Sequence, residues 1–143
     1  LVIGAYQYRR DPDDVERRIA HSLELFPGLA SRTDERAGNL SGGQQQMLAL
    51  ARVMLHDPDV LVIDELSLGL APTVVQELLA IIDRLKAAGQ TMIIVEQSLN
   101  VALAIADRAV FLEKGQVRFE GSAQELAERD DLARAVFLGR EGG

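Results

Sequence analysis

The segment Ser41–Gln44, a serine, two glycines and a glutamine, constrains the fold of this chain more than any other. Ser41 and Gln44 have the spacing of a capping box, in which the serine oxygen accepts a backbone N–H bond and the glutamine reaches back to the serine N–H. Apolar residues then recur at helical spacing as far as Leu55. We therefore predict a helix that begins just after Ser41.

Gly42 and Gly43 leave the first turn of that helix without side chains. The free N–H groups and the dipole at a helix N-terminus favour an anion such as a phosphate. The alternative is an ordinary capped helix with a glycine-rich entry. Taken alone, the segment leaves both interpretations open.

An apolar run ending in two carboxylates follows at Val60–Glu65. Four apolar residues without alternation predict a strand that is buried on both faces, as in a parallel sheet. Ligands of such sheets bind beyond the carboxyl ends of the strands, where Asp64 and Glu65 would lie. One carboxylate can hold Mg²⁺ through water, and the other can orient a water molecule for phosphoryl transfer. The alternative is a strand that merely ends at solvent, but the combination with Ser41–Gln44 favours phosphate chemistry.

Three segments in this order resemble the nucleotide-binding subunit of ABC transporters. Leu40–Gln44 is similar to the ABC signature motif, Leu61–Glu65 to Walker B, and Ser67–Pro72 to the D-loop. Val95–Gln97 and the N-terminal Gly4–Tyr6, with the Arg9–Asp11 that follows, resemble the branched-chain amino acid importer branch.

The resemblance implies an α/β fold, namely the C-terminal part of a P-loop NTPase domain of the ABC type. It would comprise a helical subdomain and a mainly parallel sheet that lacks the P-loop strand. Residues 1–56 would form the helical subdomain with the signature motif, and residues 57–143 the C-terminal part of the RecA-like ATPase core. No G-x-x-x-x-G-K-[ST] segment occurs in the chain. The family carries that loop upstream of the equivalent of Leu1, so we expect this chain alone to be inactive.

The resemblance also implies roles for individual residues. Glu65 would be the catalytic carboxylate, Asp64 would hold Mg²⁺ through water, and Gln97 would stand at the switch-histidine position that contacts the γ-phosphate. The γ-phosphate of an ATP held by the opposite subunit would be bound by Ser41, Gly42, Gly43 and Gln44.

Three positions depart from the commonest pattern of the family. Leu66 replaces the proline after the catalytic glutamate, Ala71 replaces the D-loop aspartate, and Gln97 replaces the histidine. Alanine and glutamine at the last two places resemble the importer branch named above. A glutamine amide can donate a hydrogen bond to a phosphate oxygen but carries no positive charge.

The implied function is ATP hydrolysis in an importer of branched-chain amino acids, with ATP-driven head-to-tail dimerisation coupled to transport. The expected partners are a second nucleotide-binding subunit and transmembrane permease subunits, and the expected location is the cytoplasmic face of the inner membrane. A net charge of −7 argues against nonspecific nucleic-acid binding. Two alternatives stay open, a non-catalytic interaction fragment and the ATPase of a urea or amide importer.

The remaining pattern predicts the other elements. We expect Arg17 and Arg18 to lie on a solvated face, and Ser122 with Glu125 to form a second capping box. The helices are expected at 13–25, from Pro72 to Gly89 and at 98–106, with a buried strand at 91–95 and a hairpin of 109–112 with 116–119.

Overall fold

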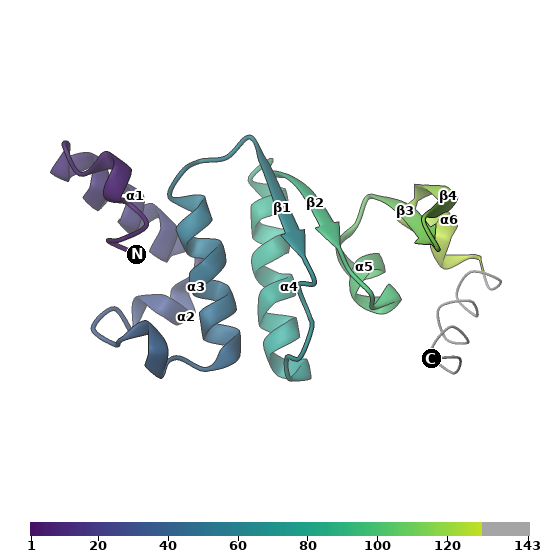
Figure 1. Cartoon of the computed structure of the whole chain (residues 1–143), viewed down its shortest axis with the longest axis horizontal. Helices are drawn as coiled ribbons and strands as arrows, with labels where there is room; N and C mark the ends of the chain where they lie inside the picture. The colour runs from purple at the N-terminus through teal and green to yellow at the C-terminus, as the bar shows by residue number, and fades with distance from the viewer. Residues whose placement is uncertain (130–143) are drawn as a thin grey trace. The chain divides into compact units, whose positions relative to one another are not determined.

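The computed structural model describes residues 1–129, and Figure 1 shows their helices and strands. The predicted ATPase-core segment, residues 57–143, therefore extends beyond the described residues. The helices are η1 (Tyr6–Tyr8), α1 (Pro12–Leu25), α2 (Pro27–Ala30), η2 (Ala37–Asn39), α3 (Gly42–Met54), α4 (Pro72–Ala87), α5 (Leu99–Ile105) and α6 (Ala123–Ala127). The strands are β1 (Val60–Asp64), β2 (Thr91–Val95), β3 (Arg108–Glu113) and β4 (Gln116–Ser122).

The chain consists of two compact units. Unit 1 comprises Leu1–Val62 and Leu68–Ile93, and unit 2 comprises Ile63–Ser67 and the chain from Ile94 onward. The signature segment therefore lies in unit 1, whereas Asp64, Glu65 and Gln97 lie in unit 2. The boundary between a helical subdomain, residues 1–56, and the ATPase core, residues 57–143, stays a prediction.

Helices α1 and α3 of unit 1 pack through a small apolar core. The N-cap residue Asp11 accepts a 3.0 Å hydrogen bond from the N–H of Asp14, so that α1 begins where a proline fixes its first turn. The buried hydroxyl of Ser22 donates to the carbonyl of Ala51 at 2.8 Å, which joins α1 to α3. The surrounding buried side chains are those of Phe26, Leu29, Met47, Leu50 and Met54.

Helix α4 presents one apolar stripe to the interior of unit 1, as its sequence predicts. It begins at Pro72 and is followed by Gly89, whose φ of +86° is a conformation that favours glycine. The buried residues of the helix are Leu78, Leu79, Ile81, Ile82 and Leu85.

Strands β1 and β2 form a two-stranded sheet, and their arrows run in the same direction in Figure 1. Burial alternates along β1, where Leu61 and Ile63 are buried but Val62 is 64% exposed. Ile93 of β2 is 55% exposed. The predictions that β1 is buried on both faces and that residues 91–95 form a buried strand are therefore wrong. An apolar run indicates that both faces of a strand are suited to burial, but it does not show what covers them. Among residues 1–129, only one face of β1 is covered.

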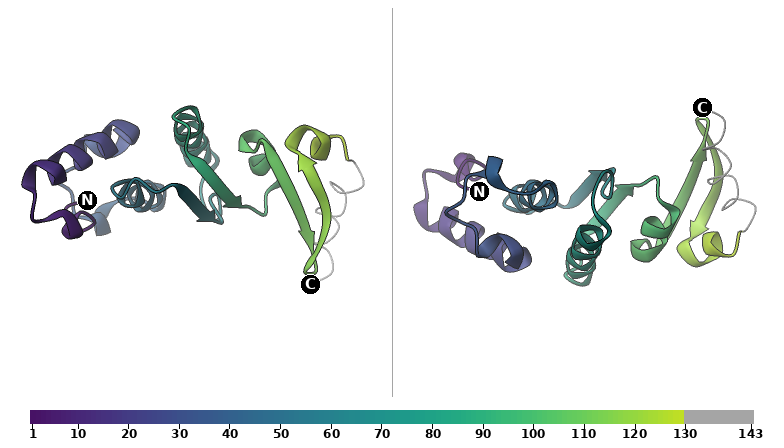
Figure 2. Two further views of the ribbon diagram at one scale, coloured as in Figure 1. Left: turned by 90° about the horizontal axis from the view of Figure 1, so that it is seen from above. Right: turned by 90° about the horizontal axis from the view of Figure 1, so that it is seen from below.

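Strands β3 and β4 form the predicted antiparallel hairpin, and their two arrows lie side by side in Figure 2. Arg108 lies opposite Ser122, and the register shifts between Phe111 and Leu112. The turn residues Lys114 and Gly115 have φ values of +49° and +77°. Two consecutive positive values are typical of the type I′ turn, which suits a two-residue hairpin loop. The predicted capping box of Ser122 and Glu125 begins α6 directly after β4.

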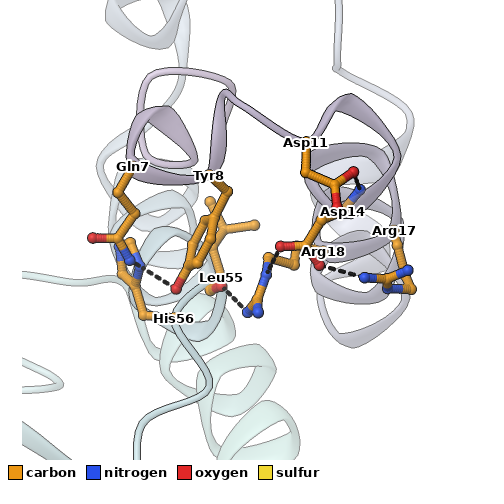
Figure 3. Close-up of polar contacts among 8 residues, drawn as sticks. All are labelled: Gln7, Tyr8, Asp11, Asp14, Arg17, Arg18, Leu55 and His56. Carbon is orange, nitrogen blue, oxygen red and sulfur yellow. Dashed lines mark hydrogen bonds and ion pairs between the residues drawn. The ribbon is translucent and has the colours of Figure 1, made fainter.

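Arg18 ties the N-terminal segment to α1 and α3 within unit 1 (Figure 3). Its Nε donates to Asp14 Oδ2 at 2.9 Å, its Nη1 donates to the carbonyl of Leu55 at 2.9 Å, and its guanidinium lies 4.0 Å from the centroid of the Tyr8 ring. The hydrogen bond from Arg18 lowers the pKa of Asp14, and the same bond raises the pKa of Arg18. The prediction of a solvated face is wrong for Arg18, because its partners come from residues far apart in the sequence.

Candidate functional site

The signature helix α3 begins with the predicted capping box. The N–H of Ser41 donates to Gln44 Oε1 at 2.9 Å, and the N–H of Gln44 donates to Ser41 Oγ at 3.4 Å. Both bonds lie at the exposed surface of unit 1. The serine hydroxyl proton and the glutamine NH₂ group remain available as donors, because the capping box uses only their oxygens.

The two signature glycines differ in their surroundings. A Cβ placed on Gly42 would meet no atom within 4 Å, whereas one placed on Gly43 would lie 2.1 Å from Cγ1 of Val74 in α4. Gly42 therefore leaves open space for a ligand at the helix N-terminus, and Gly43 lets α4 approach α3. The N–H groups of both glycines have no backbone partner among residues 1–129, as expected for a first helical turn.

The catalytic candidate Glu65 stands directly after β1 in unit 2. Its N–H donates to the carbonyl of Val95 at 2.9 Å, and its φ is +54°. A left-handed conformation costs a residue with a side chain about 1–2 kcal/mol. Such strain is found at functional sites more often than elsewhere.

Leu66, expected from the resemblance to replace a proline, directly follows Glu65. Its side chain is buried, with only 1% exposed. A proline restricts the residue before it to extended backbone. Leucine at this position therefore accommodates the left-handed φ of Glu65 and contributes apolar burial.

Gln97 lies against Glu65 in unit 2. The Gln97 Nε2 donates a 2.6 Å hydrogen bond to Glu65 Oε1. Both residues lie just beyond the carboxyl ends of paired strands, since Glu65 directly follows β1 and Gln97 is the second residue after β2. The topology therefore brings together two residues that are 32 positions apart in the sequence.

A second contact between the same two segments involves Glu96 and Ser67. Glu96 Oε1 accepts from the Ser67 hydroxyl at 2.8 Å, and Glu96 Oε2 accepts from the Ser67 N–H at 3.1 Å. Sequence reasoning assigned neither residue to the site. The two lie 29 positions apart, so no local spacing indicates the contact.

Asp64 is exposed at the end of β1. Within residues 1–129, no three His, Asp or Glu side chains gather closely enough to form a protein-only metal site. Mg²⁺ at phosphoryl-transfer sites keeps several waters and takes one or two carboxylates together with substrate phosphates. A single exposed carboxylate beside the glutamate therefore fits a water-mediated Mg²⁺ that arrives with a nucleotide.

A sequence profile of the ABC transporter family matches residues 7–67, which include the signature segment, Asp64 and Glu65. The chain belongs to the ABC transporter family. It is 48% identical over 129 residues to the high-affinity branched-chain amino acid transport ATP-binding protein BraG of Pseudomonas aeruginosa, covering 90% of this chain and 55% of that protein.

A second relative is the probable branched-chain amino acid transport ATP-binding protein LivF of Archaeoglobus fulgidus. It is 38% identical over 138 residues, which make up 94% of this chain and 56% of that protein. The structure of cbiO1 from Clostridium perfringens, part of the ABC transporter complex cbiONQ, matches with a TM-score of 0.81 and 27% identity. That match covers 96% of this chain and 55% of that one.

This chain spans about half the length of the curated relatives it matches. Its fold is the expected α/β part of an ABC-type ATPase domain. Among the described residues, no helix is long and apolar enough to cross a membrane.

Proposed function

We propose that this chain is part of the ATP-hydrolysing subunit of an ABC importer for branched-chain amino acids. The observation that carries the proposal is the 2.6 Å hydrogen bond from Gln97 to Glu65 at the ends of paired strands. A carboxylate and an amide at the same sheet edge can act on one phosphoryl group, because ligands of such sheets bind beyond the strand ends.

Each residue has a distinct task in this proposal. Glu65 orients and polarises the attacking water, Asp64 holds Mg²⁺ through water, and the Gln97 amide donates to an oxygen of the γ-phosphate. When bound, Mg²⁺ neutralises charge on the phosphate oxygens. Gln97 would exchange its bond to Glu65 for one to the phosphate, which leaves the carboxylate free to accept from water.

The signature segment serves the nucleotide of the opposite subunit. Ser41, Gly42, Gly43 and Gln44 would bind its γ-phosphate in a head-to-tail dimer. The open space at Gly42 and the free donors of the capping box support this role. Closure of the dimer would move transmembrane permease subunits, with the ATPase peripheral at the cytoplasmic face of the inner membrane.

The cargo is proposed from the relatives. Both relatives described above are named as branched-chain amino acid transport ATP-binding proteins. At 48% identity over most of this chain, BraG is the stronger support.

The head-to-tail arrangement can be tested in a completed subunit. This protein is the present chain preceded by the P-loop portion that the family carries upstream, taken from the Pseudomonas aeruginosa relative. Ser41→Arg would obstruct the γ-phosphate contact in trans, and Glu65→Gln would remove the catalytic carboxylate. Each variant alone should be inactive, whereas a mixture forms dimers with one intact composite site and recovers part of the turnover. A mixture as inactive as the separate variants contradicts the proposal.

A non-catalytic interaction fragment is the second candidate function, because the chain contains no G-x-x-x-x-G-K-[ST] segment. We propose that the chain by itself hydrolyses ATP negligibly, since it lacks the lysine and backbone amides that hold the β- and γ-phosphates. Magnesium-dependent turnover by the purified chain that Glu65→Gln abolishes would contradict this. If the completed subunit is also inactive, the interaction fragment is the better account.

A further inference from the structure

The carboxylate of Glu96 connects the segments that follow β1 and β2 in unit 2. It accepts three hydrogen bonds, from the Ser67 hydroxyl at 2.8 Å, the Ser67 N–H at 3.1 Å and the Ser98 N–H at 3.0 Å. Two of these donors belong to the turn after Glu65, and the third belongs to the residue after Gln97. Glu96 is half-buried, so solvent competes less for these bonds than at an exposed site.

These bonds lie on both sides of the contact between Gln97 and Glu65. Glu96 immediately precedes Gln97 and holds the N–H of Ser98, which immediately follows it. On the other segment, Ser67 is two residues beyond Glu65, whose own N–H donates to Val95. The backbone is therefore fastened before and after the Gln97 side chain and also beyond the Glu65 side chain.

We propose that Glu96 is a positioning residue that holds the Gln97 amide against Glu65. The catalytic consequence rests on the function proposed above, in which Gln97 and Glu65 act on the same phosphoryl group. A loose Gln97 side chain would have to be ordered at every turnover, and small displacements of a catalytic group can cost a large part of the rate.

The chemistry of the site requires a carboxylate at position 96. All three partners are donors, and an ionised carboxylate offers two acceptor oxygens and no donor. A glutamine has the same shape but presents an NH₂ group where one oxygen stood, so the backbone N–H of either Ser67 or Ser98 would face another donor. Bonds to a charged acceptor are also roughly twice as strong as bonds between neutral groups.

Glu96→Gln in the completed subunit tests this role, with Glu128→Gln as the matched control on the exposed end of α6. We expect Glu96→Gln to lower kcat about tenfold while KM for ATP changes less than about twofold, since only the arrangement of the reacting groups is altered. In a Gln97→Ala background, Glu96→Gln should lower kcat by less than a further factor of about two, because the two residues act as one unit. A merely structural residue would lower Tm and cost the same factor in both backgrounds, which would overturn the proposal.

A second measurement separates this inference from the proposed function. The side-chain amide protons of Gln97 have an NMR signal that depends on their bond to Glu65. That signal should move in Glu65→Gln and in Glu96→Gln, but not in Glu128→Gln. If it stays in place in Glu96→Gln, the positioning role is contradicted, whatever the turnover. If the completed subunit does not hydrolyse ATP but the signal moves as expected, the proposed function fails and the positioning role stands.

Discussion

The Gln97 Nε2 donates to Glu65 Oε1 at a distance of 2.6 Å, which joins the ends of two paired strands. An amide carries no charge, so this contact is a hydrogen bond and not an ion pair. A histidine at the same position could become positively charged near neutral pH and bind the carboxylate more tightly. Glutamine at position 97 therefore contacts Glu65 without the pH dependence that a protonating histidine would introduce.

The first prediction concerns the two signature glycines. Gly43→Ala should destabilise the chain by about 1–3 kcal/mol, because the added methyl group would overlap Cγ1 of Val74. Gly42→Ala is the matched control, since its methyl group enters open space. Chemical denaturation measures both effects. Val74→Ala should recover part of the loss in Gly43→Ala, and equal stabilities of the two glycine variants would contradict the packing role of Gly43.

The second prediction tests the backbone strain at Glu65. Because φ is +54°, Glu65→Gly should be more stable than Glu65→Ala by about 1 kcal/mol. The adjacent Asp64 lies in β1, where glycine is unfavourable, so Asp64→Gly should be less stable than Asp64→Ala. Thermal or denaturant unfolding of the four variants checks the comparison. If the alanine variant were the more stable one at both positions, the backbone of Glu65 would not be strained.

The third prediction concerns acid stability. The hydrogen bond from Arg18 lowers the pKa of Asp14 in the folded state. A lowered pKa means that the carboxylate stabilises the fold above its unfolded value, near 3.9, and that this contribution is lost as the pH falls through and below that value. Asp14→Asn should therefore reduce the loss of unfolding free energy between neutral pH and pH about 3.

Asp13→Asn is the control for this experiment, because Asp13 lies in the same first turn of α1. It removes a charge near the helix dipole but leaves the bonds from Arg18 to Asp14 intact. An acid response of Asp14→Asn that matches the unsubstituted chain would show that the contact with Arg18 does not contribute to acid stability.

The fourth prediction concerns the exposed apolar side chains of β1 and β2. Val62 and Ile93 are both more than half exposed, at 64% and 55%. Exposed apolar strands favour pairing with other chains, so the isolated chain should self-associate at micromolar concentration. Val62→Lys should reduce that association in sedimentation experiments, whereas Thr73→Lys on the exposed start of α4 should not. A monomeric unsubstituted chain would contradict this prediction.

Local rules predicted much of the fold correctly. The capping boxes at Ser41 and Ser122 depend on residues three positions apart, and the turn at Lys114 and Gly115 depends on two neighbours. The helix that begins at Pro72 follows directly from its apolar period. These features are determined by nearby residues and do not require knowledge of the tertiary structure.

Features that depend on distant residues were predicted less well. The apolar run of β1 shows that two faces could be buried, but it does not show what covers them, and Val62 is exposed. The sequence pattern predicts that Arg18 is a surface residue, because its partner, the carbonyl of Leu55, lies 37 positions away in the sequence. Glu96 was missed for the same reason, because its donors in Ser67 become neighbours only when the strands pair.

The catalytic role of Glu65 is the central claim, and Glu65→Gln in the completed subunit tests it most directly. The substitution keeps the shape of the side chain and removes the carboxylate. ATP turnover should fall by about 10²-fold or more, the scale expected for loss of a general base, while ATP binding and the ATP-dependent dimer persist. Turnover near that of the unsubstituted subunit would contradict the assignment of Glu65 as the catalytic carboxylate.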